Sequence, residues 1–149
     1  MRLILPTLLL PLLACQGAPA GSWAGELACG DEDSDGVIAA SFDLRRQDER
    51  VYEGPGEVSF TGTFEIEGAW RDYAEVQTFD PLVLTLAEPT GAQDVTLSGT
   101  PATCVTTVDG VQTSDQCSEG EAVEWTLSWD GADVLSLDQG DCTGELVRD

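Results

Sequence analysis

Carboxylates are the most abundant side chains in this 149-residue chain that could take part in chemistry. The chain holds 28 aspartates and glutamates but no histidine. Without an imidazole there is no Ser–His or Cys–His pair and no histidine metal ligand, and neither a G-x-S-x-G turn nor a phosphate-binding loop occurs. We therefore expect a non-catalytic protein. The alternative is an enzyme that uses a carboxylate pair, as in glycoside hydrolysis, although so many acids single out no particular pair.

One acidic run has the spacing of a calcium ligand set. Asp31, Asp33 and Asp35 alternate with other residues and precede Gly36, which is similar to the first half of an EF-hand calcium loop. The twelfth position of that loop carries a bidentate glutamate, whereas here it is Phe42, so an EF-hand is excluded. Weak Ca²⁺ binding by the three aspartates remains a hypothesis. The favoured interpretation is a solvated acidic loop between two strands, with no cofactor.

The N-terminal segment has the features of an export signal. Arg2 supplies one positive charge, and the apolar run over 3–13 that follows is interrupted only by Pro6, Thr7 and Pro11. A membrane-spanning helix needs about 20 apolar residues, so this run has the length of the apolar region of a signal peptide.

The end of that run, Leu12-Leu13-Ala14-Cys15, resembles the lipobox of bacterial lipoproteins. The resemblance implies a signal peptide over 1–14, an acylated Cys15 with a short linker over 15–21, and one domain over 22–149. Palmitate-type chains form a stable anchor, since each buried methylene contributes about 0.8 kcal/mol. In that family a residue other than Asp after the cysteine, here Gln16, implies delivery to the outer membrane. The alternative is ordinary signal cleavage after Cys15 and a secreted protein.

Charge restricts the partners of this protein. Its formal net charge is −22, which repels nucleic acid and anionic lipid surfaces. We therefore expect no nucleic-acid partner. Acidity of this kind serves solubility more often than it marks a specific function.

The folded part shows the period-two alternation of half-buried β-strands. The apolar positions of the alternating segments are Trp23, Leu27, Ile38, Phe42, Val58, Phe60, Leu82, Leu84, Val95, Leu97, Val123 and Leu127. Turn signals separate them at Asp35-Gly36, Gly54-Pro55-Gly56, Pro89-Thr90-Gly91, Asp109-Gly110, Asp130-Gly131 and Gln139-Gly140. Gly62 interrupts its segment and marks an expected bend or bulge. No window has a helical period, so we predict an all-β meander of about 8–10 strands, forming a small closed barrel or a β-sandwich.

Four cysteines besides Cys15 form an even set, which in an exported chain indicates two disulfides with three formally possible pairings. A two-residue turn at Asp109-Gly110 would bring Cys104 close to Cys117 if the hairpin also contained a bulge. Cys29 would then pair with Cys142. That second bond would align the first and last strands antiparallel and close a barrel without exposed edges.

In that alignment Arg148 falls opposite Trp23. Gly21-Ser22-Trp23 is similar to the G-x-W motif of the calycins, the lipocalin and avidin group, in which a basic residue of the last strand packs across the tryptophan. The resemblance implies a calycin-like barrel in which Trp23 and Arg148 have a structural role.

Five aromatic residues share the predicted inward positions and could contact a small apolar ligand or a glycan: Phe60, Phe64, Trp70, Trp125 and Trp129. The alternative is that they fill the core. We expect a binding or interaction module held at the membrane by its acyl anchor, whose partner is a small ligand or another envelope protein. An open pocket would favour the ligand, and a filled barrel would favour the protein partner.

Overall fold

The computed structural model describes residues 17–31, 34–117 and 121–149. It contains ten β-strands: β1 (Gly21–Asp31), β2 (Ser34–Arg46), β3 (Val51–Ile66), β4 (Ala69–Leu86), β5 (Gln93–Gly99), β6 (Pro101–Val108), β7 (Val111–Ser114), β8 (Val123–Trp129), β9 (Val134–Gln139) and β10 (Cys142–Arg148). Among these residues there is no helix long and apolar enough to cross a membrane. The predicted all-β class is confirmed.

Eight of the strands form a closed antiparallel barrel, as predicted. Their hydrogen-bonded order is β3-β2-β1-β10-β9-β8-β5-β4, and a further pairing of β3 with β4 closes the circle. β6 pairs with the same edge of β4 as β5 does, at an earlier part of that strand, and β7 pairs with β6 at the end of the strand order. β4 therefore has two neighbours besides β3: its residues Val83–Leu86 pair with β5, and Tyr73–Phe79 pair with β6.

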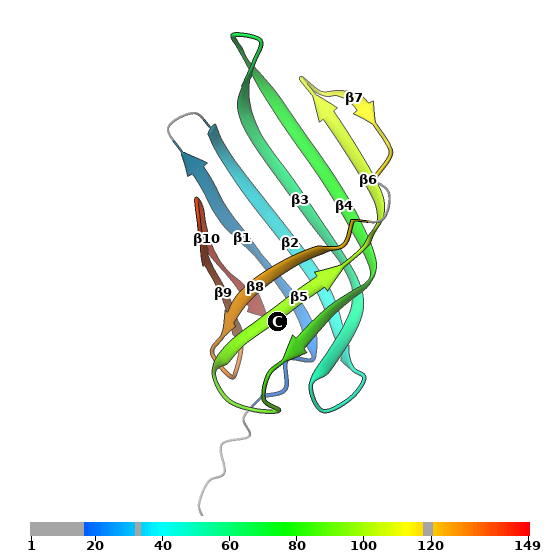
Figure 1. Ribbon diagram of the computed structural model, residues 1–149, viewed down its shortest axis with the longest axis vertical. Coiled ribbons are helices and arrows are strands. Elements are labelled where there is room, and N and C mark those ends of the chain that lie inside the picture. Colours follow the sequence, from blue (N-terminus) through cyan, green and yellow to red (C-terminus); the bar gives the residue numbers. More distant parts are fainter. Residues whose placement is uncertain (1–16, 32–33, 118–120) are drawn as a thin grey trace, which may run out of the picture.

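The two halves of the barrel consequently differ (Figure 1). β5 and β8 cross one half, at the end where the chain enters β1, and we call it the closed half. The long strands β2, β3 and β4, together with β6 and β7, continue beyond this crossing and form a curved sheet, which we call the open half. The β3–β4 hairpin lies at the end of the molecule opposite to the chain's entry into β1.

The first and last strands pair in the predicted register. Trp23 lies opposite Arg148, Leu27 opposite Gly144, and Cys29 opposite Cys142. The Cys29–Cys142 disulfide is present, with 113 residues of sequence separation. Gly25 and Gly144 let the strands approach, since a Cβ on Gly25 would lie 2.2 Å from the carbonyl oxygen of Glu145. The prediction of a barrel closed by these two strands is confirmed.

The β6–β7 hairpin carries the second predicted disulfide, Cys104–Cys117. Val108 pairs with Val111 across a turn at Asp109 and Gly110, whose φ angles are +49° and +76°. Positive φ at both central positions is typical of the tight turns that connect antiparallel strands. The register shifts between Thr106 and Thr107, so the bulge expected in this hairpin is present.

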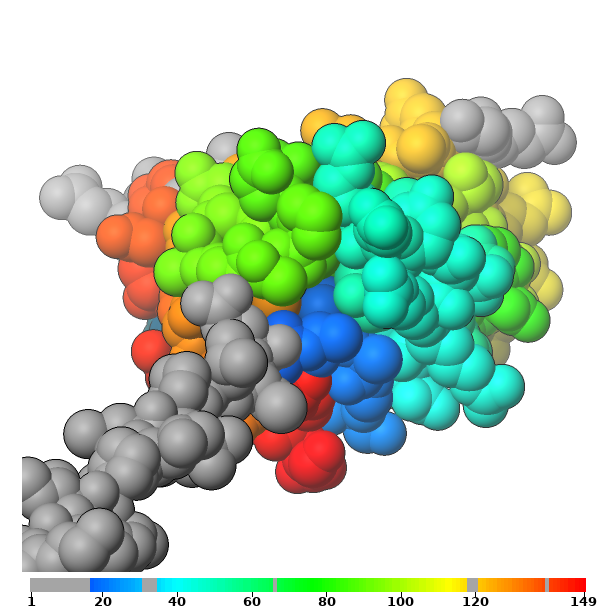
Figure 2. Space-filling model, turned by 90° about the horizontal axis from the view of Figure 1, so that it is seen from below, coloured from blue at the N-terminus to red at the C-terminus, as the bar shows by residue number. Residues whose placement is uncertain are grey.

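A continuous apolar core fills the closed half. Leu82, Leu84 and Leu86 point inward at alternate positions of β4 and are almost wholly buried. They belong to a cluster with Trp23, Leu27, Ala40, Phe42, Leu44, Tyr52, Phe79, Val95, Leu97, Leu127, Trp129, Leu135, Leu137 and Leu146. The space-filling view from this end shows segments from β1, β3, β10 and the 80–100 region meeting over it (Figure 2). Core side chains therefore occupy this half of the barrel.

Arg148 fixes the segment that precedes β1 to the same end. Its guanidinium lies 5.7 Å from the centre of the Trp23 ring and donates hydrogen bonds to the carbonyl oxygens of Ala18 and Ala20. It also forms an ion pair with Asp133. The Trp23 indole N–H donates to the carbonyl oxygen of Pro19 at 2.9 Å. Residues 17–20 are thus attached to the closed half by both members of the predicted Trp23–Arg148 pair.

Two predicted turns lie inside strands instead. Asp35 and Gly36 belong to β2 and pair with Gly30 and Cys29 of β1. Gly54-Pro55-Gly56 is a β-bulge in β3, where the register against β4 shifts between the two glycines. A Cβ at residue 54 would lie 1.8 Å from the carbonyl oxygen of Asp43, so glycine is needed here for close approach of the β2 and β3 backbones.

Gly62 is not a bulge, because it keeps a regular register with Gly36 and Tyr73. An isolated glycine in a strand can mark a bend, a bulge or a close contact. At Gly62 it marks the close contact, and the bulge occurs at the Gly54-Pro55-Gly56 segment of the same strand.

Candidate binding site

The inner face of the open half carries half-buried aromatic and polar side chains in place of a filled core. Residues paired across antiparallel strands share a face, so the register defines this inner face. Its inward residues are Ile38, Phe60, Phe64, Tyr73, Glu75, Gln77 and Thr106. All of them are partly exposed, whereas the inward residues of the closed half are almost fully buried.

Three aromatic rings form the apolar part of this face. The centres of Phe60 and Phe64 lie 5.5 Å apart, and Tyr73 lies 6.0 Å from Phe60 and 5.6 Å from Phe64. The ring of Phe60 lies over Gly36 and Gly62, where added Cβ atoms would meet it at 2.6 and 3.0 Å. The two glycines therefore let Phe60 lie against the sheet, which keeps the ring close to the inner surface.

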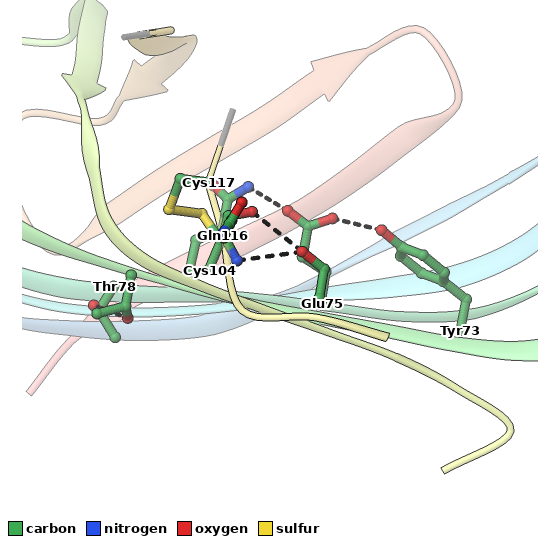
Figure 3. Close-up of a disulfide and its surroundings, with 9 residues drawn as sticks. Tyr73, Glu75, Thr78, Cys104, Gln116 and Cys117 are labelled. Carbon is green, nitrogen blue, oxygen red and sulfur yellow. Dashed lines mark hydrogen bonds between the residues drawn. A yellow bond between two sulfur atoms is a disulfide. The ribbon is translucent and has the colours of Figure 1, made fainter. Parts of the chain in front are cut away.

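A polar ladder runs beside the rings along β4. Tyr73, Glu75 and Gln77 occupy alternate positions of β4 and therefore share one face. Figure 3 shows the side chains of Tyr73 and Glu75 directed toward one another. The Tyr73 hydroxyl donates to Oε2 of Glu75 at 2.6 Å, and Nε2 of Gln77 donates to Oε1 of Glu75 at 2.5 Å. Each oxygen of the Glu75 carboxylate thus has a neutral donor, and these bonds hold the carboxylate in one orientation.

The environment of Tyr73 agrees with this arrangement. Burial raises the pKa of the Tyr73 hydroxyl, and the hydrogen bond to Glu75 and the negative charge of its carboxylate raise it further, whereas a hydrogen bond with Thr106 lowers it. The hydroxyl therefore stays protonated at neutral pH and remains the donor in its bond with Glu75.

A cavity of about 190 Å³ lies where Glu75 and Gln77 face β6 and the chain that returns to β8. Cys104, Thr106 and the Cys104–Cys117 disulfide contribute to its wall, with Gln116 beside the disulfide (Figure 3). Glu121 supplies a second carboxylate to the lining. The disulfide ties the chain around Gln116 to β6, so it positions one wall of the cavity.

An ion pair joins β4 to the β6–β7 turn in the open half. Nη1 of Arg71 donates to Oδ2 of Asp109 at 2.6 Å, and the backbone N–H of Asp72 donates to Oδ1 of Asp109 at 3.1 Å. Arg71 lies opposite Phe64 in the β3–β4 register, and Asp109 belongs to the β6–β7 turn. These bonds link the β3–β4 hairpin to the β6–β7 turn.

The Arg71–Asp109 contact predicts a measurable titration shift. The hydrogen bond from Arg71 and that from the Asp72 backbone lower the pKa of Asp109 below its ordinary value of 3.8. The stabilisation from this carboxylate is therefore present above pH ~4 and is lost as the pH falls through the lowered pKa. We expect Arg71→Gln to raise the pKa of Asp109 toward 3.8, measured by NMR titration of the Asp109 carboxyl carbon. An unchanged midpoint would show that the arginine does not bond Asp109 in solution.

The predicted ligand-facing aromatics fall in three different places. Phe60 and Phe64 line the open half, as described above. Trp129 belongs to the core and is 1% exposed, and Trp125 packs edge-on against Phe79 with 6.0 Å between ring centres. The alternative of core filling therefore describes Trp129 and, in part, Trp125.

The inward placement of Trp70 is wrong. Trp70 pairs with Glu65 on the outer face and is 59% exposed. The reason is the two-residue turn at Glu67-Gly68, which pairs Ile66 with Ala69. Trp70 is therefore one position out of phase with the inward residues of β3.

Two of the three predicted calcium ligands belong to described strands, Asp31 at the end of β1 and Asp35 near the start of β2. Asp35 is exposed on β2, Asp33 lies outside the described residues, and the side chain of Asp31 is likewise not described. Within the described ranges, no group of three or more acidic, cysteine or histidine side chains is placed to hold a metal ion. Cys15, the predicted lipidation site, also lies outside the described residues.

A larger hollow of about 540 Å³ lies on the outer face of the open half. The side chains that line it on the outer face include Val37, Thr61, Thr63, Asp72 and Ala74. Tyr73 also contributes to its lining, but the ring of Tyr73 packs against Phe60 and Phe64 on the inner face. We therefore place the candidate site on the inner face, around Phe60, Phe64 and Glu75.

The polar residues of the site were not predicted from the sequence. Tyr73, Glu75 and Gln77 alternate with Ala74 and Val76, so the apolar side chains of this segment point outward and the polar ones inward. The polar residues would have been assigned to solvent by pattern alone. The signal that could have found them is the register of a long β3–β4 hairpin around Glu67-Gly68, which places Glu75 opposite Phe60.

Comparison with known proteins adds no relative to this description. No family model, no curated protein and no solved structure matches the chain.

Proposed function

We propose that this protein is a lipid-anchored, non-catalytic binding protein of the bacterial cell envelope that takes up a small ligand on the inner face of its open half. One observation carries the proposal: the barrel is packed with side chains at one end, whereas its inward residues at the other end are half-buried aromatic and polar groups. Ligand sites in proteins combine apolar walls with a few fixed polar groups. Phe60, Phe64 and the Tyr73–Glu75–Gln77 ladder have this composition.

The place of the proposed anchor supports an orientation in which the open half faces away from the membrane. Arg148 binds Ala18 and Ala20 at the closed end, and Cys15 precedes Gly17 by only two residues, about 7 Å of extended chain. A membrane-embedded acyl group on Cys15 would thus keep the closed end near the bilayer. The open half would face away from it, where a soluble ligand has access.

The binding part of this proposal is tested by NMR with the full chain. A panel of small neutral, cationic and sugar-like fragments is added, and shifts of assigned backbone and aromatic-ring resonances are mapped. We expect any fragment that binds to shift Phe60, Phe64, Tyr73 and Thr106 without shifting the core residue Leu84. The proposal fails if no fragment binds, or if the shifts map to the outer face.

The anchor is tested by the intact mass of the protein purified from the membranes of its own host. We expect cleavage before Cys15, added acyl chains and four cysteines protected from alkylation, and we expect Cys15→Ser to leave the membrane fraction. A mature chain that lacks Cys15 would instead identify a secreted protein and overturn the anchor.

A further inference from the structure

The inner face of the open half carries a negative charge without a cationic partner. Both oxygens of Glu75 accept hydrogen bonds from neutral donors, Tyr73 and Gln77, and no salt bridge to Glu75 occurs among the described residues. Arg71, which shares this face, is engaged by Asp109 at 2.6 Å. The neutral donors fix the position of the carboxylate without neutralising it, so its charge remains available to a ligand.

The other arginines do not supply the missing charge. The chain has six cationic side chains, all of them arginines. Arg148 binds Asp133 at the closed end, and the remaining described ones lie at or next to the β2–β3 connection, at the same end. Residues 32–33 and 118–120, which lie outside the described ranges, include no basic residue.

Aromatic faces stand next to this carboxylate. Phe60 is the direct cross-strand partner of Glu75, and Phe64 and Tyr73 complete a cluster whose ring centres lie 5.5–6.0 Å apart. An aromatic face attracts a cation through its quadrupole, and the attraction is largest for cations with little hydration, such as alkylammonium groups. A fixed carboxylate beside such rings attracts the same ligands by charge.

The net charge of the whole molecule also favours a cationic ligand. The net charge of −22 raises the local concentration of cations and lowers that of anions. Glu121 adds a second carboxylate to the cavity beside Glu75. The volume of this cavity, about 190 Å³, suits a small molecule. An anionic ligand would meet repulsion both at long range and inside the cavity.

We propose that the inner face of the open half binds a small organic cation of the alkylammonium class, with Glu75 as its counter-ion and Phe60, Phe64 and Tyr73 as its aromatic wall. This inference rests on the proposed function and specifies its ligand chemistry. Thr106, opposite Glu75 on β6, offers a hydroxyl to a polar group on the same ligand.

Isothermal titration calorimetry with two probes tests the charge directly. Choline is an alkylammonium alcohol, and 3,3-dimethyl-1-butanol is its neutral isostere, with carbon in place of nitrogen. We expect the full chain to bind choline at least about tenfold more tightly than the isostere, a difference of about 1.4 kcal/mol. Raising the salt concentration should weaken choline binding because it screens the carboxylates.

Glu75→Gln is the decisive variant, because the amide keeps the shape of the side chain and removes its charge. We expect it to weaken choline binding about tenfold or more, while Glu57→Gln, an outward-facing carboxylate on β3, leaves it within about twofold. The two variants change the net charge equally, so they separate the local carboxylate from the general field. Phe64→Leu should weaken choline binding about threefold through loss of one ring, and it provides a second test if Glu75→Gln does not fold.

Equal affinity for choline and its isostere, or equal effects of Glu75→Gln and Glu57→Gln, would overturn the cation inference. If the isostere or a neutral sugar still bound at Phe60 and Tyr73, the proposed binding function would stand, and only the preference for a cation would be wrong. A chain that bound none of the fragments would refute both.

The cation could also be the headgroup of a lipid. Co-sedimentation of the Cys15→Ser chain with phosphatidylcholine vesicles, lost in Glu75→Gln, would assign the same chemistry to a headgroup. Binding of choline without co-sedimentation would assign it to a free molecule.

Discussion

Replacing both Cys29 and Cys142 with alanine will lower the free energy of unfolding by about 4 kcal/mol, because this disulfide closes a very long loop. The two cysteines are 113 residues apart, and chain entropy predicts about 4.7 kcal/mol for a loop of ~100 residues. The bond also joins the strands that close the barrel. Without it, β1 and β10 depend on their hydrogen bonds and on packing of Trp23, Leu27 and Leu146.

Urea-induced unfolding of the oxidised protein and of the double variant measures this loss. The control is the double replacement of Cys104 and Cys117, whose disulfide spans a sequence separation of only 13 residues. By the same chain-entropy argument, its loss should lower the free energy of unfolding by about 3 kcal/mol. A larger loss in the control than in the Cys29/Cys142 variant would contradict the role of the long-range bond in barrel closure.

The second large effect is expected at Trp23. Trp23 is 1% exposed, donates its indole N–H to Pro19 and carries the Arg148 guanidinium over its ring. Trp23→Ala should lower the free energy of unfolding by about 3–5 kcal/mol, since a buried tryptophan leaves a large cavity. Thermal or urea unfolding gives the value.

Trp70 provides the matched control for this substitution. It is 59% exposed on the outer face of β4, so Trp70→Ala should change the free energy of unfolding by no more than about 0.5 kcal/mol. A loss at Trp70 comparable with that at Trp23 would mean that the outer face of the β3–β4 hairpin is covered in solution.

The closed half and the β6–β7 hairpin could be predicted because alternation, turn residues and cysteines point to one answer. Alternation gave the faces of β1 and of the leucines in β4, and the Asp109-Gly110 turn fixed one hairpin and thereby one disulfide. The other disulfide then set the β1–β10 register, in which Trp23 meets Arg148.

The polar side chains that face inward in the open half could not be predicted, whereas the inward positions of Phe60 and Phe64 were, because the β4 segment is polar on its inner face and in part apolar on its outer face. Glu75 and Gln77 point inward while Val76 points outward, which reverses the usual meaning of the alternation. Glycine and proline added a second ambiguity, since they mark turns, bulges and close contacts alike. At Gly54-Pro55-Gly56 they mark a bulge, and at Gly36 and Gly62 they make room for Phe60.

The central claim is that one half of the barrel is filled and the other presents an accessible inner face. Solvent paramagnetic relaxation of aromatic-ring protons, measured by NMR on the full chain with a neutral soluble gadolinium chelate, tests it most directly. We predict strong relaxation enhancement for the rings of Phe60, Phe64 and Tyr73, and little for Trp23, Phe42 and Phe79. Equal protection of all six rings would contradict the account, because the barrel would then be filled throughout and only its outer surface could recognise a partner.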